Sequence, residues 1–600
     1  MFQTYTETAR PEQAIPRLSA LRAKLAAQKL DGFLIPRADR FMGEYVAPCD
    51  ERLAWLTGFT GSAGFCAVLA QQAGIFVDGR YTVQVRTQVD TDLFTPLPWP
   101  ATRVGHWLAQ TAPKGGRIGF DPWLHSASEL EKLTADSASA DLEFVAVDNL
   151  IDAIWPDQPA PPCAPILPHP LEFSGQSAQD KITHLSQALK ADAALITQPD
   201  SIAWLLNVRG SDIPRNPVPH AMAILHRSAE VDLFCDPAKI TEDTRAHLPN
   251  CVTLHGEDGL HTALAAFSGQ LQIDPATGPV ALERSLGANA SVHHAEDPCL
   301  MPKARKNPAE LEGMRAAHAR DAVAMVRFLA WLDAQTPGPN LTEIDIAKAL
   351  EGFRREDNAL RDISFDSIVG SGPHGAVVHY RVTEQTNRSL SAGELLLVDS
   401  GGQYLDGTTD ITRTIPIGAP DQIGHLEKDC YTRVLQGVIA ISRARWPEGL
   451  AGRDLDPLAR FPLWTAGRDY DHGTGHGVGA FLSVHEGPQR ISRVSHVALE
   501  SGMILSNEPG YYKEGAFGIR LENLIVVTPA PEIDGQDART MLSFETLTWV
   551  PFDRRMILKS ALSPDEITWI DAYHAEVAQR IGPRLEGTPA QWLAAATAPL

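Results

Sequence analysis

The sequence predicts an α/β (α+β) protein built from several domains, and three observations lead to that prediction. The chain has 600 residues, whereas a single hydrophobic core stops growing at roughly 250–300 residues. Helical patterns alternate with short apolar strands through the first half, which is typical of α/β domains. The second half begins with one long amphipathic pattern and continues in strand-and-turn sequence.

Two proline-rich stretches divide the chain. Residues 155–170 contain seven prolines, and residues 297–308 form a weaker break of the same kind. Domain boundaries commonly fall in such proline-rich linkers. We therefore expect domains at residues 1–160, 161–304 and 305–600.

The first two domains look like copies of one another. Residues 52–61 read RLAWLTGFTG, and residues 201–210 read SIAWLLNVRG. The flanking patterns agree as well: helices at 18–27 and 182–189, strands at 32–36 and 193–197, and strands ending in an acid at 75–78 and 231–236. One short tryptophan motif can match by chance, but the agreement of its neighbours favours a duplication of one α/β domain.

The third domain opens with a predicted helix over Ala309–Gln335. Apolar side chains recur there at helical spacing; they are Leu311, Met314, Ala317, Ala322, Met325, Phe328, Leu329 and Leu332. The residues that carry chemistry lie downstream of this helix.

Composition excludes several functional classes. The net charge is −22, whereas nucleic-acid binding requires a surplus of basic side chains. Seven scattered cysteines without a CxxC pair argue against a disulfide framework and a thiolate zinc site. No apolar run approaches the ~18 residues of a membrane span, and residues 1–17 lack the apolar core of a signal peptide. We expect a cytoplasmic protein with no nucleic-acid or membrane partner.

Two aspartates follow one another on a predicted hairpin. Residues 393–400 read GELLLVDS, a buried strand ending in Asp399, and residues 408–417 form a returning strand that contains Asp410. In a hairpin centred near Tyr404–Leu405 the two carboxylates would lie roughly opposite. Like charges in that arrangement repel, whereas a bound cation would make it favourable. The alternative is a pair of solvated turn acids.

Two glutamates repeat the arrangement further along. A strand over residues 503–507 leads into Glu508, and the next strand, residues 518–527, contains Glu522. An acid in so apolar a strand is costly unless it is paired or bound to metal. Arg520 shares the face of Glu522 because side chains alternate along a strand, so a structural Arg520–Glu522 pair is the alternative.

Histidines lie between and around these pairs. Residues 472–479 read HGTGHGVG, and four glycines in eight residues make a helix improbable. In extended backbone His472 and His476 point the same way, although a glycine loop with incidental histidines would have the same sequence. His485 follows nine residues after His476, and His379 precedes the first aspartate.

Four carboxylates and one imidazole form a ligand set for two adjacent divalent ions. Oxygen-rich sites with one imidazole suit Mn²⁺, Zn²⁺ or Co²⁺, and paired ions of this kind hydrolyse peptides or phosphates. No HExxH, P-loop or GxSxG motif occurs in the sequence. Metal-assisted hydrolysis is therefore the chemistry that the sequence favours.

The order and spacing of these residues resemble the pita-bread metallopeptidases. An Asp is followed eleven residues later by a second Asp, then by a His, a Glu, and another Glu fourteen residues later. The stretches 399–414, 472–479, 508–510 and 519–523 resemble the aminopeptidase P and prolidase branch of that family. Its large members place two related α/β domains before the pita-bread catalytic domain, as expected here.

The resemblance implies a role for each residue. Asp399 would chelate one ion, Asp410 and Glu522 would bridge both, and His476 and Glu508 would hold the other. Glu508 would also carry a proton during catalysis, and His379 and His485 would steady the carbonyl oxygen. By the same resemblance, His472, Tyr512 and Arg520 would bind substrate around a proline ring, and Mn²⁺ is the expected ion.

Three functions fit this resemblance. The expected one is an Xaa-Pro aminopeptidase, which hydrolyses the N-terminal Xaa-Pro bond of peptides with proline at the second position. A prolidase-type dipeptidase is the alternative enzyme. A non-catalytic pita-bread binding protein is the third, but such relatives lose ligands, and all five are present here. The resemblance also implies a homodimer.

Overall fold

The computed structural model describes residues 1–600, apart from the side chain of residue 339. The chain forms two compact units. An N-terminal unit comprises Thr8–Leu300, and a C-terminal unit comprises Met301–Leu600 together with the first seven residues, Met1–Glu7. The start of the chain thus belongs to the unit that contains the candidate site.

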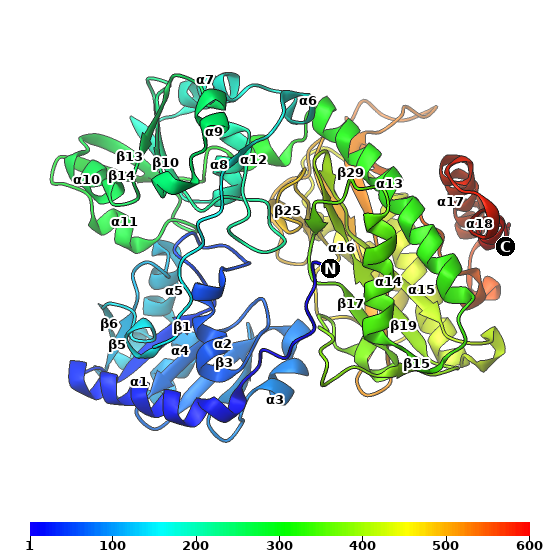
Figure 1. Cartoon of the computed structure of the whole chain (residues 1–600), viewed down its shortest axis with the longest axis horizontal. Helices are drawn as coiled ribbons and strands as arrows, with labels where there is room; N and C mark the ends of the chain where they lie inside the picture. The colour runs from blue at the N-terminus through cyan, green and yellow to red at the C-terminus, as the bar shows by residue number, and fades with distance from the viewer. The chain divides into compact units, whose positions relative to one another are not determined.

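The N-terminal unit contains two six-stranded mixed sheets flanked by helices (Figure 1). The first sheet has the order β4-β3-β2-β1-β5-β6. Its elements are α1 (Ala14–Gln28), β1 (Gly32–Pro36), α2 (Arg52–Thr57), β2 (Phe65–Leu69), β3 (Ala73–Val77), α3 (Gln84–Gln88), β4 (Thr95–Pro98), α4 (Val104–Thr111), β5 (Arg117–Phe120), α5 (Ala127–Asp136) and β6 (Glu143–Ala146).

The second sheet has the order β12-β11-β10-β8-β13-β14. Its elements are α7 (Ala178–Ala188), β8 (Ala193–Ile196), α8 (Pro199–Leu206), β10 (Met222–His226), β11 (Val231–Phe234), α9 (Glu242–His247), β12 (Val252–His255), α10 (Gly259–Ala266), β13 (Gly269–Ile273), α11 (Val280–Arg284) and β14 (Ala290–His294). Two short strands, β7 (Leu167–Pro168) and β9 (Val208–Arg209), pair beside it, and α6 (Leu171–Ser174) follows β7.

The two sheets are copies of one topology. In each, the first strand pairs antiparallel with the second and parallel with the fifth, as β1 does with β2 and β5, and β8 with β10 and β13. The tryptophan motifs form the matching helices α2 and α8. The predicted duplication is confirmed.

The C-terminal unit surrounds its sheets with long helices. They are α13 (Pro308–Asp333), α14 (Glu343–Arg355), α15 (His425–Ser442), α16 (Gly452–Trp464), α17 (Pro564–Ile581) and α18 (Gly587–Ala596), preceded by the short α12 (Leu300–Ala304). Figure 1 shows α13 and α14 packed side by side. The start of α13 is set by a capping box: Asn307 accepts from the Glu310 amide, and Glu310 accepts from the Asn307 amide.

Two sheets carry the candidate site. Strands β17 (Ile368–Ser371), β19 (Leu395–Ser400) and β22 (Ile411–Pro416) form one sheet. The other contains β23 (Arg445–Pro447), β30 (Met541–Thr546), β29 (Asn523–Pro529), β26 (Ile504–Asn507), β24 (Gly475–Gly477) and β25 (Glu486–Ile491), in that order. Smaller pairings are β15 (Gly338–Thr342) with β18 (Ser389–Leu390), β16 (Asp362–Ile363) with β20 (Gly402–Tyr404) and β21 (Gly407–Thr408), and β27 (Gly510–Lys513) with β28 (Phe517–Arg520).

Two strands predicted as continuous are interrupted at an acid. The predicted strand 408–417 is divided into β21 and β22, with Asp410 in the break. The predicted strand 518–527 is divided into β28 and β29, with Leu521 and Glu522 in the break. The continuous-strand prediction was wrong at both places, because the chain passes from one sheet to another there and each acid lies at the crossing.

No helix in the described part of the chain is both long enough and apolar enough to cross a bilayer.

Candidate metal centre

Five candidate ligands come from five successive parts of the C-terminal unit. Asp399 lies in β19, Asp410 just before β22, His476 in β24, Glu508 just after β26 and Glu522 just before β29. Asp399, Asp410 and Glu522 are 8%, 3% and 1% exposed, so these acids are removed from water rather than solvated. The interpretation of solvated turn acids is therefore wrong.

The hairpin register differs by two residues from the predicted one. Asp399 pairs with Thr412, and Ser400 with Ile411, so Asp410 lies two residues before the position opposite Asp399. The turn is centred on Leu405–Asp406 because Tyr404 pairs with Gly407. A shift of two residues preserves the face of a strand, so both carboxylates still point to the same side.

His476 lies among the carboxylates. Its Nε2 is 3.5 Å from Asp410 Oδ2 and 3.5 Å from Glu508 Oε1. Ligand atoms of Asp410, His476 and Glu522 all lie within 4.8 Å of one another. The structure therefore brings acids from both hairpins and the histidine between them to one point.

Glycines on both sides of His476 allow this approach. A Cβ at Gly475 would overlap the Ser506 carbonyl of β26, and a Cβ at Gly477 would overlap the Glu486 carbonyl of β25. Only glycine fits between neighbouring strands at such distances. The Ser506 hydroxyl accepts from the His476 amide (2.9 Å) and lies 3.1 Å from Glu508 Oε1, which links the two ligands.

Buried residues of α16 hold the segment that leads to His476. Asp456 accepts from the Thr474 hydroxyl (2.7 Å) and from Arg460 Nε (2.7 Å). Arg460 also donates to the carbonyls of Tyr470 (2.7 Å) and His472 (2.6 Å). The Asp456–Arg460 pair of α16 thus supplies hydrogen bonds to residues 470–474, which have no regular secondary structure of their own.

Arg520 pairs with Asp399 rather than with Glu522. Its Nη2 donates to Asp399 Oδ2 at 2.6 Å, and its Nε donates to the Thr412 hydroxyl at 3.2 Å. That hydroxyl in turn donates to Glu522 Oε2 at 2.8 Å. The alternative of a direct Arg520–Glu522 pair is not what the structure shows, because Glu522 lies beyond the end of β28 and Thr412 stands between the two.

The predicted substrate-binding residues form a chain of hydrogen bonds. His472 Nε2 lies 2.9 Å from the Tyr512 hydroxyl, and Arg520 Nη1 donates to the same hydroxyl at 2.7 Å. Burial raises the pKa of Tyr512 to about 12 despite the opposing charge of Arg520. The tyrosine therefore stays neutral, and its orientation is set from both sides.

His485 and His379 approach the cluster from other segments. The His485 ring lies 4.3 Å from the His476 ring, edge to face, and is half-buried. The carbonyl of Val378, next to His379, accepts from Arg520 Nη2 at 3.3 Å. Since the same nitrogen binds Asp399, the backbone at His379 is held next to the cluster.

The charges of the cluster are unbalanced. Burial, followed by the charges of Asp399 and Glu508, raises the pKa of Asp410 well above its ordinary value, and burial with the other acids does the same for Glu522. Asp399 Oδ1, Asp410 Oδ1 and Glu522 Oε1 have no hydrogen-bond partner among the described residues. Buried carboxylate oxygens without donors are what a bound divalent cation requires, so the residues present fit a metal site.

Such a cluster of carboxylates with one imidazole, on this arrangement of sheets, is characteristic of metal-dependent hydrolases. Residues 312–529 match the model of metallopeptidase family M24, and residues 540–600 match the C-terminal region of peptidase M24. Residues 17–154 and 157–310 each match a creatinase/prolidase N-terminal domain. The chain belongs to metallopeptidase family M24, with two creatinase/prolidase N-terminal domains before a pita-bread catalytic domain.

Relatives align along nearly the whole chain. Aminopeptidase P2 of Arabidopsis thaliana is 41% identical over 95% of this chain and 86% of its own length. A probable Xaa-Pro aminopeptidase P of Aspergillus niger is 38% identical over 94% of both. The crystal structure of the X-prolyl aminopeptidase of Caenorhabditis elegans, described as a cytosolic enzyme with a di-nuclear active site, matches with a TM-score of 0.92 and 34% identity, over 98% of this chain and 100% of that one.

Several supporting residues escaped the sequence analysis. Thr412 links Arg520 to Glu522, Ser506 links His476 to Glu508, and Asp456 holds Thr474. A signal existed for two of them: Thr412 stands two residues after Asp410, and Ser506 two residues before Glu508, so each shares a strand face with a candidate ligand. Nothing in the sequence near Asp456 pointed to the site.

Proposed function

We propose that this protein is an Xaa-Pro aminopeptidase that uses two divalent metal ions. The observation that carries the proposal is the convergence of Asp410, Glu508 and Glu522 on His476, with the charge of Asp399 close enough to raise the pKa of Asp410. The full-length similarity to aminopeptidases P and to a structure with a di-nuclear active site supports it. We also propose domain boundaries near residues 160 and 304, which the four matched regions support.

We propose the ligand roles that the resemblance to the pita-bread metallopeptidases implies. Asp399 would hold one ion, because one of its oxygens is already bound to Arg520 and only the other is free. Asp410 and Glu522 would bridge, and His476 with Glu508 would complete the second site. An oxygen-rich set with one imidazole suits Mn²⁺, with Zn²⁺ and Co²⁺ as alternatives. When bound, the ions would lower the pKa of a water molecule so that hydroxide is available near neutral pH.

The chain's own groups would move the proton and orient the substrate. Glu508 would accept a proton from the attacking water and deliver it to the leaving nitrogen. His485 and His379 would donate hydrogen bonds to the carbonyl oxygen as negative charge develops there. The His485 ring lies 4.3 Å from the His476 ring, and the backbone carbonyl next to His379 accepts from Arg520.

Specificity for proline would come from a pocket rather than from a backbone hydrogen bond. The nitrogen of an Xaa-Pro bond carries no hydrogen, so a peptidase cannot hold it through an N–H group. His472 and Tyr512 would form walls for the pyrrolidine ring, held in place by Arg520. Arg520 is only 1% exposed. It would therefore contribute to the pocket indirectly, by holding Tyr512 and Asp399 in place.

We further propose a cytosolic homodimer. Seven cysteines that form no disulfide among the described residues, together with the cytosolic X-prolyl aminopeptidase of C. elegans, support the compartment. For the dimer, α16 exposes Leu458 (42%), Phe461 (63%) and Trp464 (42%), three large apolar side chains spaced three residues apart on one face. Such a row is typical of protein–protein contact surfaces, and sedimentation at micromolar concentration would test it.

The decisive experiment compares substrates and metal states. The protein is stripped of metal with a chelator, restored with Mn²⁺, and assayed on an Arg-Pro-Pro peptide, its Arg-Ala-Pro analogue, the N-acetylated peptide and an Xaa-Pro dipeptide. We expect metal-dependent release of the first residue from the Arg-Pro-Pro peptide alone among the three longer substrates. Cleavage restricted to the dipeptide would instead identify a prolidase-type dipeptidase, and full activity after exhaustive chelation would refute the metal mechanism.

A further inference from the structure

One loop of the C-terminal unit carries a residue of the proposed mechanism. Residues 372–388, here called the His379 loop, connect β17 to β18 and begin with a 3-10 helix, Gly372–Ala376. Apart from that turn and its internal hydrogen bonds, the loop has no regular secondary structure. Something other than a sheet or a helix must therefore fix the direction of the His379 side chain.

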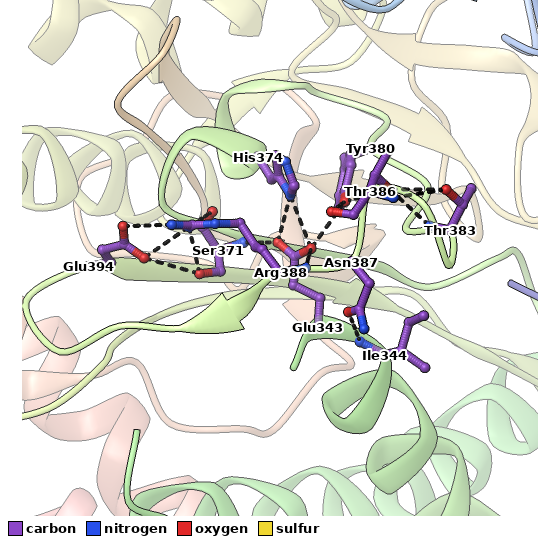
Figure 2. A network of polar contacts seen from close by, with 10 residues as sticks. All are labelled: Glu343, Ile344, Ser371, His374, Tyr380, Thr383, Thr386, Asn387, Arg388 and Glu394. Carbon is purple, nitrogen blue, oxygen red and sulfur yellow. Dashed lines mark hydrogen bonds and ion pairs between the residues drawn. The ribbon is translucent and has the colours of Figure 1, made fainter. Parts of the chain in front are cut away.

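One buried carboxylate makes several of the contacts that hold this loop, beside those from Arg381 and Thr383 to the first seven residues of the chain. Glu343, the first residue of α14, has a fully buried side chain (0% exposed). Its Oε1 accepts from the Ser371 amide (2.8 Å) and lies 2.9 Å from His374 Nδ1. Its Oε2 accepts from the Tyr380 hydroxyl (3.0 Å) and, more weakly, from the Arg388 amide (3.4 Å). Figure 2 shows these groups converging on Glu343.

The contacts are distributed over the whole loop. Ser371 and Arg388 lie at its two ends, and His374 and Tyr380 lie between them. Arg388 also donates to the Ser371 carbonyl (2.6 Å) and makes two hydrogen bonds to Glu394 (2.9 and 3.0 Å), which brings the ends together. One carboxylate thus links both ends of the loop to two points within it (Figure 2).

The two neighbours of His379 in the chain are held from different sides, one by this network and the other by Arg520, which binds Asp399. On one side, the adjacent Tyr380 is 7% exposed and bonded to Glu343, and burial with the Glu343 charge raises the pKa of its phenol. On the other side, the adjacent Val378 carbonyl accepts from Arg520 Nη2, which also donates to Asp399. The backbone of His379 is therefore held from both neighbours.

We propose that Glu343 is a positioning residue for His379: its buried carboxylate anchors the His379 loop and so fixes where the imidazole faces the substrate. The inference rests on the proposed function, in which His379 donates to the substrate carbonyl. Such a donor acts only when it is held close to its productive geometry, and a displacement of about 1 Å can cost on the order of 100-fold in rate. A charged acceptor suits the task because hydrogen bonds to a carboxylate are stronger than neutral ones.

The test is a double-mutant cycle with Glu343→Gln and His379→Ala. The glutamine keeps the shape but presents an NH₂ group to donors that need an acceptor. We expect Glu343→Gln to lower kcat about 10- to 100-fold, with KM changed less than about threefold and metal content unchanged. If Glu343 acts through His379, adding Glu343→Gln to His379→Ala should cost little more activity. Losses that multiply in the double mutant, or a loss of bound Mn²⁺, would overturn the inference.

A matched control lies on the preceding helix. Glu310, in the first turn of α13, is also buried (7% exposed) and accepts from the Asn307 amide (2.9 Å). Glu310→Gln should therefore leave kcat within about threefold of the wild type. If Glu343→Gln fails to fold, Tyr380→Phe removes only the hydroxyl next to His379 and should show the same non-additivity with a smaller loss; additive loss there would count against the inference.

Hydrogen exchange separates this inference from the proposed function. In Glu343→Gln, amides of residues 372–388 should exchange faster while those of β19 and β26 do not change. That result does not depend on which peptide is cleaved, so it would stand even if the protein failed to hydrolyse Xaa-Pro bonds. Unchanged exchange in the His379 loop would refute the positioning role whatever the substrate.

Discussion

Buried acids occur in both units of the protein, but they are neutralised in different ways. In the N-terminal unit, Asp212 is paired with Lys239: Nζ donates to Oδ2 at 3.0 Å, and both side chains are almost fully buried. Asp39, in the same unit, has no cation as a hydrogen-bond partner. Burial, assisted by the charge of Asp50, raises its pKa to about 7.

In the C-terminal unit, four acids share one arginine and one histidine. Arg520 binds Asp399 directly, and His476 lies 3.5 Å from both Asp410 and Glu508. One pair can be neutralised by a lysine, and a single acid can keep its proton. Four acids around one point cannot all be paired with one arginine and one histidine, and they cannot all stay protonated. Three of their oxygens therefore have no hydrogen-bond donor among the described residues. An unbalanced cluster of charges, rather than a buried acid as such, therefore indicates a metal site.

The largest effect is expected from Asp410→Asn. Losing a proposed bridging ligand should abolish metal retention and lower kcat by more than about 10³-fold, since even one transition-state donor is worth about 10²–10³. The metal-free variant should nevertheless melt at a higher temperature than the metal-free wild type, because one repelling charge is gone. Metal analysis, kinetics and thermal unfolding measure the three effects. Asp421→Asn, at an exposed position, is the control, and a lower melting temperature of the metal-free variant would contradict the comparison.

Lys239→Met should have the opposite effects to Asp410→Asn: it should lower stability and leave activity unchanged. It leaves the buried Asp212 without its cation, which typically costs about 3–5 kcal/mol of folding free energy. Denaturant unfolding should show this loss, while metal content and KM of the folded enzyme stay the same. Lys190→Met, at an exposed position of the same unit, should cost less than about 0.5 kcal/mol. Equal stability of the two variants would show that the pair contributes nothing.

His485→Ala tests whether His485 is a metal ligand or only a neighbour of the ligands. Its ring contacts the His476 ring, but it is not among the proposed ligands. Removing a transition-state donor should lower kcat by about 10²–10³ while metal remains bound. The exposed His425→Ala serves as the control. Loss of stoichiometric metal from His485→Ala would make this histidine a ligand and enlarge the cluster.

The smallest effect concerns Asp39. Its pKa of about 7 in the folded protein exceeds the ordinary value of 3.8, so the folded state binds the proton more tightly than the unfolded chain does. Stability from this group is therefore complete below pH 3.8 and is lost as pH rises through about 7. Asp39→Asn should match the wild type near pH 4 and exceed it in stability above pH 7.

A geometric reason supports the same variant. Asp39 Oδ2 lies 3.6 Å from His220 Nε2, and neither atom has a hydrogen-bond partner among the described residues. Burial lowers the pKa of His220 to about 3, so its ring is neutral and its nitrogen can accept from an asparagine amide. Unfolding curves measured from pH 4 to 8 would show the difference; a parallel shift at every pH would contradict it.

Much of the fold was accessible from the sequence because its signals are local. The strand predicted at residues 32–36 is β1, and the helix predicted over 309–335 is α13, Pro308–Asp333. Apolar periodicity, a cap and a proline at the first helical turn act within a few residues, so they can be read without a partner. The same holds for the order of the five candidate ligands, whose roles stay a prediction until the metal experiments are done.

The two duplicated domains, elements such as α13 and β1, and the order of the candidate acids and histidines could all be predicted from the sequence. Three contacts could not: Arg520 binds Asp399 instead of Glu522, Thr412 joins Arg520 to Glu522, and the Glu343 carboxylate binds the His379 loop. The reason is physical: these contacts depend on strand register and on where a chain leaves one sheet for another. A shift of two residues preserves the face of every side chain and still changes its partner.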